Sequence, residues 1–168
     1  MTSVSTPASE VSGHTALSFV IHPIPAEFVT RVRSTLLDDF GRPVEIITAQ
    51  GGEPMRDQLH RAEAGERIIL CSFQSVPLPS IFAEIGPVFI SADLSPHLSF
   101  TDSLPLGYFN RTFALRAYDA QDRIVESTLV EPAAAPAVIR RLLAGPGVSH
   151  LHARFAGHGC FASRIDRA

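Results

Sequence analysis

The sequence contains no lysine, and all fourteen of its basic side chains are arginine. Seventeen acidic residues outnumber them, which gives a formal net charge of -3 and an isoelectric point near 6.1. Binding to a phosphate backbone needs a dense basic face, so the charge balance argues against nucleic acid as a partner. Arginine forms bidentate contacts with carboxylates and phosphates. A GC-rich genome also favours arginine over lysine, so the absence of lysine has little functional weight.

Long apolar runs and closely spaced cysteines are also missing. The longest apolar stretches, such as 67–73, are far shorter than the ~20 residues that a membrane-spanning helix needs. The two cysteines, Cys71 and Cys160, lie far apart and do not indicate a disulfide framework. The first residues have neither a basic leader nor an apolar signal core. We therefore expect a soluble cytoplasmic protein with no membrane partner.

What the sequence does contain is typical of a folded domain. Hydrophobic residues make up 45% and charged residues 18% of the chain, close to ordinary globular usage. The length of 168 residues fits one domain. Residues 1–14 are rich in Ser, Thr, Pro and Ala without periodicity and predict a flexible N-terminal tail. Residues 15–168 then form the single domain.

Two segments have helical periodicity. Pro25 suits the first turn of a helix, and apolar residues then recur at every fourth position from Phe28 to Phe40, before Gly41. The second predicted helix covers about 136–144 and ends before a Gly-Pro-Gly turn.

The remaining apolar segments are short and are bounded by turn residues, as strands are. We predict strands at 17–21, 44–48, 67–73, 82–92, 112–118, 123–130, 148–155 and 158–165. Asp119–Asp122 is short enough to join two strands as a hairpin, and the last two strands form another. Residues 56–62 are predicted to be helical or irregular, and 94–107 to be a long surface loop. Because βαβ alternation is absent, we predict an α+β fold: a mainly antiparallel sheet of about six to eight strands packed by two principal helices.

Short motifs from Gly52 onward resemble a known family. The matching residues are Gly52-Glu-Pro54, Arg56, Leu59, Gly65-Glu66, Glu84 to Phe89, Arg116 to Asp119, His152-Ala-Arg154, Gly159-Cys-Phe161 and Ile165-Asp-Arg167. In this order they resemble the bacterial family catalogued as domain of unknown function 1203, which implies no known activity. The family is associated with a Cys-x-x-Cys pair, able to bind metal or perform dithiol chemistry, where this chain has Met55 and Gln58. If the family function depended on that pair, this member would be altered or inactive.

The predicted strand over 148–155 places three polar side chains on one face, namely His150, His152 and Arg154. Three polar side chains in a row need solvent, a protein partner or a ligand. The simplest interpretation is the solvent-exposed face of a half-buried sheet.

The length of the turn after this strand decides where Cys160 lies. A two-residue loop places Cys160 opposite Ala153 on the apolar face, whereas a three-residue loop places it opposite Arg154 beside the polar row. Only the second register favours a reactive thiolate near arginine and histidine. A buried, inert cysteine is the commoner case. His152, His158 and Cys160 could also be read as zinc ligands, but no fourth ligand is specified, and we predict no metal site.

Arg116 lies within an apolar strand, and a buried arginine requires an anionic partner. Glu84 is the candidate, and the simpler interpretation is a structural ion pair that holds the sheet together, because such pairs are common outside active sites. Alternatively, Arg116 and Arg154 hold a small anionic ligand while Glu84 or His152 transfers protons.

Two hypotheses about function follow. In the first, the chain is a small anionic-ligand binding domain in which Glu84, Arg116 and Arg154 bind the ligand. If it is an enzyme, Cys160 is the catalytic nucleophile or redox centre and His152 is the base. In the second, it is a non-catalytic structural or protein-interaction domain in which the same residues form a polar network. No phosphate loop, dinucleotide fingerprint or hydrolase elbow is present, so standard nucleotide and hydrolase functions are unsupported, and the sequence leaves the cofactor unknown.

Overall fold

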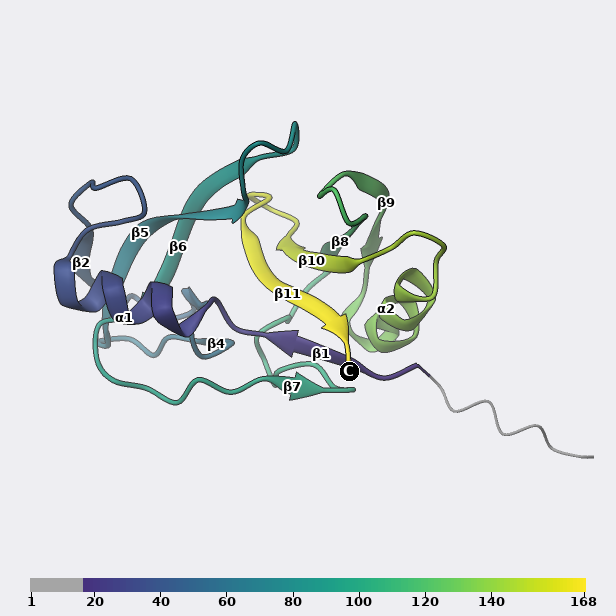
Figure 1. The fold of residues 1–168 in the computed structure, drawn as a ribbon. Helices are drawn as coiled ribbons and strands as arrows, with labels where there is room; N and C mark the ends of the chain where they lie inside the picture. The colour runs from purple at the N-terminus through teal and green to yellow at the C-terminus, as the bar shows by residue number, and fades with distance from the viewer. Residues whose placement is uncertain (1–16) are drawn as a thin grey trace, which may run out of the picture.

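The computed structural model describes residues 17–168 (Figure 1). The tail predicted at 1–14 therefore lies outside the described residues. Within them, eleven strands form two mostly antiparallel sheets that accompany two α-helices and a short 3-10 helix at Pro132–Ala134. This confirms the α+β class, with the strands divided between a six-stranded and a five-stranded sheet.

The six-stranded sheet has the order β7-β1-β11-β10-β8-β9, and every neighbouring pair is antiparallel. The hairpin predicted through Asp119 is present between β8 and β9. Asp119 shapes its turn, since one carboxylate oxygen accepts the N–H groups of Gln121 and Arg123 at 2.8 and 2.9 Å. The strands are β1 (Phe19–His22), β7 (Phe100–Thr101), β8 (Phe113–Tyr118), β9 (Ile124–Val130), β10 (His150–Phe155) and β11 (Phe161–Arg167).

Helix α2 (Ala135–Leu143) covers one face of this sheet and begins and ends within one residue of the prediction. Ile139 and Leu142 are buried on the helix and belong to the same apolar cluster as Leu115, Leu151 and Ile165 of the strands. Alternation along β10 places Leu151 and Ala153 in this core and turns the polar residues of the strand to the opposite face.

The five-stranded sheet has the order β2-β5-β6-β3-β4 and contains the one parallel pairing found in residues 17–168, between β3 and β6. Helix α1 (Ala26–Thr35) packs Phe28 and Val32 against Ile69 and Ile90 of β5 and β6. Neither α-helix in the described chain has the length and hydrophobicity needed to cross a bilayer. The strands are β2 (Glu45–Thr48), β3 (Pro54–Met55), β4 (His60–Arg61), β5 (Arg67–Val76) and β6 (Glu84–Ser91).

Helix α1 is shorter than its periodicity predicts. It ends at Thr35 because Leu36 adopts the left-handed conformation, with φ of 55°. The chain then turns back through Asp38, whose carboxylate accepts the N–H groups of Phe40 and Arg42. Leu36 and Phe40 are therefore exposed. Their four-residue spacing matches that of a helix, although the helix has already ended.

Two other segments also differ from the prediction. Part of the loop expected at 94–107 is strand β7, in which Phe100 and Thr101 pair with Ile21 and Val20 of β1. Residues 56–59 form a turn, which agrees with the irregular alternative for 56–62, but the strand β4 that follows was not predicted. Both strands are two residues long and gain their stability from a neighbouring strand, so the local sequence carries little signal for them.

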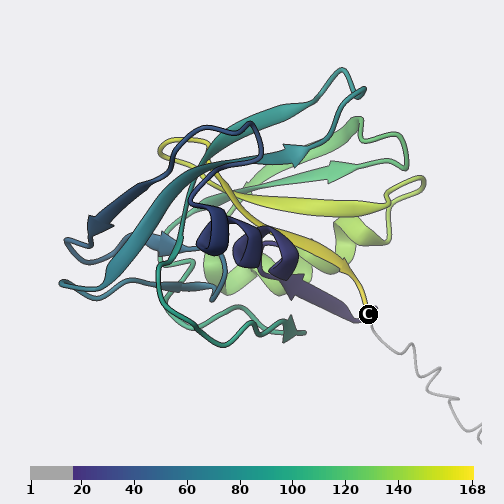
Figure 2. The ribbon, with the colours of Figure 1, turned by 60° about the vertical axis from the view of Figure 1, so that its left-hand side comes forward.

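The polar face of β10 is not exposed to solvent, which corrects the simplest interpretation of its sequence. His150, His152 and Arg154 are each at most 3% exposed. A series of aromatic contacts covers this face, running from Phe28 of α1 through Phe73 of β5 and Phe161 of β11 to His152, with ring centroids 5.0–5.4 Å apart. In Figures 1 and 2, α1 and α2 lie on different sides of β11. The sheet is thus covered on both faces.

We expect Leu142→Ala to lower the free energy of unfolding by about 3 kcal/mol, because it leaves a cavity between α2 and the six-stranded sheet. Leu142 is 1% exposed, whereas Leu129 on the outer face of β9 is 65% exposed. The matched variant Leu129→Ala should cost less than about 0.5 kcal/mol in urea unfolding. Equal losses for the two variants would contradict this packing.

Candidate functional site

An ion pair between the two sheets holds Arg154. Its Nη1 donates to Oε2 of Glu84 at 2.8 Å, its Nη2 contacts Oε1 of the same carboxylate, and its Nε donates to the carbonyl of Gly159 at 3.0 Å. Burial lowers the pKa of Arg154, and the charge of Glu84 opposes that shift. Arg154 is 2% exposed and Glu84 is 35% exposed, so the pair closes one edge of the buried polar face.

Arg116 of β8 shares the same carboxylate. Its Nη1 donates to Oε2 of Glu84 at 3.4 Å, which confirms the partner predicted from sequence. Glu84, Arg116 and Arg154 therefore lie together, and both guanidinium groups already have a protein anion. Within this group Arg116 and Glu84 are 34% and 35% exposed, whereas Arg154 is buried.

Two buried histidines lie on the same strand face as Arg154, and Nε2 of one of them, His150, lies 3.9 Å from Oδ1 of Asp122. The rings of His150 and His152 lie 5.2 and 4.7 Å from the ring of Tyr118, and Nδ1 of each histidine has no partner among residues 17–168. Burial, reinforced by the charges of His150, Arg154 and neighbouring arginines, lowers the pKa of His152 to about 2. Burial also lowers the pKa of His150. At neutral pH His152 is therefore an uncharged ring.

His152 and Cys160 border different cavities. His152 borders a cavity of about 580 Å³ together with His22, His97 and Arg164. Cys160 borders another, of about 760 Å³, with His158. Within residues 17–168 no three His, Cys, Asp or Glu side chains gather as metal ligands, and His152, His158 and Cys160 do not meet. The structure thus brings together the three predicted ligand-binding residues but not the two predicted catalytic ones.

The turn before Cys160 is longer than either register considered from the sequence, and both were wrong. The N–H of Phe155 donates to the carbonyl of Cys160 at 3.0 Å, and the N–H of Gly159 donates to that of Phe155 at 2.8 Å. Arg154 pairs with Phe161, and an irregularity between Ala153 and Arg154 shifts the register by one residue. Gly159 has φ of 70°, a conformation that glycine allows at the end of the turn. Cys160 therefore lies opposite Phe155 in the chain pairing, and it is partly exposed.

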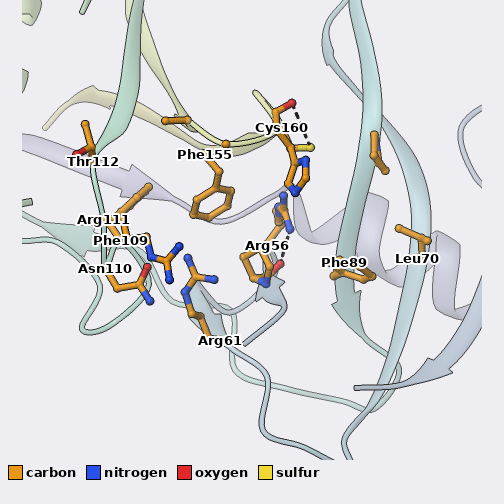
Figure 3. A pocket seen from close by; sticks show the side chains of 15 residues that line it. Arg56, Arg61, Leu70, Phe89, Phe109, Asn110, Arg111, Thr112, Phe155 and Cys160 are labelled. Atoms are coloured by element: carbon orange, nitrogen blue, oxygen red, sulfur yellow. Dashed lines mark hydrogen bonds between the residues drawn. The ribbon is translucent and has the colours of Figure 1, made fainter. Parts of the chain in front are cut away.

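The cavity beside Cys160 is lined by side chains from both sheets and from the loop before β8. Figure 3 shows Arg56, Arg61 and Arg111 converging on the space next to Phe155. We call this the arginine pocket. None of its lining residues is acidic; they are Pro54, Arg56, Arg61, Leu70, Pro87, Phe89, Phe109, Asn110, Arg111, Thr112, Phe155, Ala156, Gly157, His158 and Cys160.

Arg56 is the most buried charge of the arginine pocket, at 2% exposed. Its Nε donates to the carbonyl of Phe161 at 2.9 Å and its Nη1 to that of Pro54 at 2.5 Å, while Nη2 has no hydrogen bond within residues 17–168. The adjacent Asp57 turns away and pairs with Arg33 at 2.7 Å. Burial lowers the pKa of Arg56, and no carboxylate in the described chain pairs with it to oppose the shift.

Arg61 and Arg111 add two further charges. Arg61 donates to the carbonyls of Tyr108 and Gly52 at 3.2 and 2.7 Å, and burial lowers its pKa. The guanidinium carbons of Arg56 and Arg61 lie 5.1 and 5.3 Å from the ring centre of Phe155, a cation–π arrangement. The exposed Arg111 makes no ion pair or side-chain hydrogen bond with residues 17–168. The pocket therefore concentrates positive charge with no acidic side chain to neutralise it.

Sequence reasoning did not select these three arginines as site residues. Arg56 had a signal, because it lies within the motif that starts at Gly52. Arg61 and Arg111 had none: one is on the short strand β4, the other lies before β8, and only the meeting of the two sheets brings them to Cys160.

Comparison with known proteins identifies the family. A family model described as "Protein of unknown function (DUF1203)" matches residues 52–167. The chain belongs to this family. The matched segment includes Arg56, Arg61, Arg111 and Cys160, but the family description names no activity. No curated protein and no solved structure matches the chain.

Met55 and Gln58, which stand where the resemblance implies cysteines, both contact neighbouring residues. Met55 is buried in a small apolar cluster with Ile68 and Ala62. Gln58 makes a hydrogen bond of 2.6 Å between its Oε1 and Nε2 of His60. Cysteine chemistry in this chain is thus confined to Cys71 and Cys160.

We expect Glu84→Gln to lower the free energy of unfolding by about 2 kcal/mol, because Arg154 then stays buried without an anion. Glu126→Gln is the matched control: its partner Arg141 and Glu126 itself are both exposed. That variant should cost less than about 0.5 kcal/mol in chemical denaturation. A loss at Glu84 no larger than that of the control would show that the buried pair does not stabilise the sheets.

We also expect stability to decrease in acid. The pKa of His152 is about 2 in the folded protein, against an ordinary value of 6.5. Between these values the unfolded chain binds one more proton, so the free energy of unfolding falls as pH drops below about 6.5, by up to about 1.4 kcal/mol per pH unit. His152→Gln should make this slope shallower by about one proton between pH 6 and 4.5.

His158→Gln, at an exposed ring, is the control for this slope. The slope of the free energy of unfolding against pH is measured by urea unfolding of wild type, His152→Gln and His158→Gln at a series of pH values. Parallel slopes for wild type and His152→Gln would rule out His152 as the source.

Proposed function

We propose that this protein binds a small organic anion in the arginine pocket. The observation that carries the proposal is that three guanidinium groups meet in a cavity with no acidic lining residue. Like charges at close range repel each other, and an anion between them relieves that repulsion while gaining charge-assisted hydrogen bonds.

A comparison among buried arginines supports this interpretation. Arg154 has Glu84, and the partly buried Arg33 has Asp57. Arg56 is as buried as Arg154 but has only carbonyl oxygens and an aromatic ring as partners. A buried guanidinium is costly without an anion, so the missing partner of Arg56 is best supplied by a ligand.

The walls of the pocket favour an organic anion with a flat apolar part. Phe89, Phe109, Phe155 and Leu70 supply apolar surface, and Asn110 supplies an amide. A volume of about 760 Å³ is within the range of small-molecule sites. Carboxylate or phosphate groups would contact the arginines, while the body of the ligand packs on the rings.

For Glu84, Arg116, Arg154 and His152 we propose a different role, that of a structural polar network. The carboxylate already engages both arginines, and His152 is buried and uncharged. The proposal thus keeps the ligand class predicted from the sequence but moves the site, because Cys160 alone of the predicted site residues lines the arginine pocket.

The test uses isophthalate, a planar aromatic dicarboxylate, in calorimetric titrations of the purified protein. Arg111→Gln should weaken binding roughly five- to tenfold, because one charge-assisted contact is lost. Arg123→Gln removes an exposed arginine from the β8–β9 turn and should leave the affinity unchanged. Higher salt should weaken binding to the wild type.

The proposal fails if wild-type protein shows neither heat of binding nor thermal stabilisation at about 10 mM isophthalate and at the same concentration of inorganic phosphate. It also fails if Arg111→Gln and Arg123→Gln bind isophthalate as the wild type does, since the anion would then bind elsewhere.

A further inference from the structure

Cys160 lies on the wall of the arginine pocket, and anion binding alone gives it no role. Its side chain is partly exposed, and its Sγ has one weak contact, 3.9 Å from the carbonyl of His158. The other cysteine, Cys71, is buried beneath α1, and burial raises its pKa to about 12. Only one thiol of the described chain is therefore open to reagents.

We propose that the arginine pocket binds small anionic disulfides and that Cys160 undergoes thiol–disulfide exchange with them. This inference rests on the proposed function, because the arginines must first hold the anionic groups of the reagent.

Arg56 connects the anion site to the thiol. Its Nε donates to the carbonyl of Phe161, the residue after Cys160, at 2.9 Å, and Arg56 and Cys160 line the same cavity. The two groups are close enough that a Cys160 thiolate favours the charged form of Arg56. Arg56 lines the cavity, and its Nη2, which makes no hydrogen bond within residues 17–168, is available to a bound anion.

The lining determines the class of disulfide. Arg61 and Arg111 lie on the other side of Phe155 from Cys160 in Figure 3, so an anionic group on them directs the rest of a short molecule toward the sulfur. Phe155 provides apolar surface between these ends, and Phe109 adds to the apolar lining near Arg111. A disulfide with a carboxylate on an apolar or aromatic half matches this order of contacts, whereas a neutral disulfide matches only the apolar part.

The exchange is balanced by the two sulfur reactants alone. The Cys160 thiolate attacks one sulfur of R–S–S–R, a bond forms between them, and the original S–S bond breaks. Its electron pair leaves with the second sulfur as R–S⁻, which takes a proton from solvent according to pH. Cys160 is oxidised to a mixed disulfide while one half of the reagent is reduced to a thiol, so no further oxidant is needed.

The test compares two chromogenic disulfides on the folded protein. Dithiobis(nitrobenzoate) has a carboxylate on each aromatic half, and dithiodipyridine is neutral; each releases a coloured thiolate or thione on reaction. We expect one thiol per folded chain to react, and a denatured chain to release two equivalents, one for each cysteine. The anionic reagent should react with folded wild type roughly tenfold faster than with the denatured chain, because binding raises its local concentration.

Arg111→Gln should slow the anionic reagent roughly fivefold and change the rate of the neutral reagent less than about twofold. Arg123→Gln should change neither rate. Isophthalate added to wild type should slow the anionic reagent by competition, a measurement that needs no variant. Cys160→Ser should abolish the reaction of the folded chain with both reagents.

The inference is overturned if Cys160 reacts with the anionic reagent no faster than the denatured chain does, or if Arg111→Gln slows both reagents equally. Isophthalate titration of Cys160→Ser separates this failure from failure of the anion site. If Cys160→Ser binds isophthalate and the wild-type thiol does not react, the exchange is rejected and the proposed function is retained. If neither Cys160→Ser nor wild type binds isophthalate, both are rejected.

Discussion

The contact between Glu84 and Arg154 is the constraint on which the arrangement of the two sheets depends. Glu84 begins a strand of the five-stranded sheet, and Arg154 lies within the six-stranded sheet, so their ion pair joins two layers that share no strand. A buried ion pair gains little over apolar packing, but a buried charge that loses its partner is costly. The pair therefore selects one relative placement of the sheets more than it adds stability.

That placement produces two different environments from one strand. Along β10, His152 and Arg154 face the second sheet, where they are buried among aromatic rings and the carboxylate of Glu84. Phe155, at the end of the same strand, faces the arginine pocket. Charge on the first side is neutralised by Glu84, whereas the pocket on the second side has no acidic lining residue.

The sequence predicted those features that depend on local patterns. The β8–β9 hairpin and helix α2 followed from turn residues and apolar spacing, and the partner of Arg116 followed from the cost of a buried charge. The division into two sheets did not follow, because apolar alternation marks a buried face without saying what covers it. Cys160 was misplaced because Gly159 allows a longer turn, and a one-residue change of register moves a side chain to the other face.

Phe155 belongs at once to the apolar core and to the arginine pocket. Its ring lies 5.3 Å from that of Tyr108 inside the core, and two guanidinium groups lie over it on the pocket side. A change of this side chain would alter the apolar core and the shape of the arginine pocket together, so evolution cannot adjust either one through it alone. Substitutions at the exposed loop positions of the rim, such as Asn110 and Arg111, would instead change the pocket and leave the core intact.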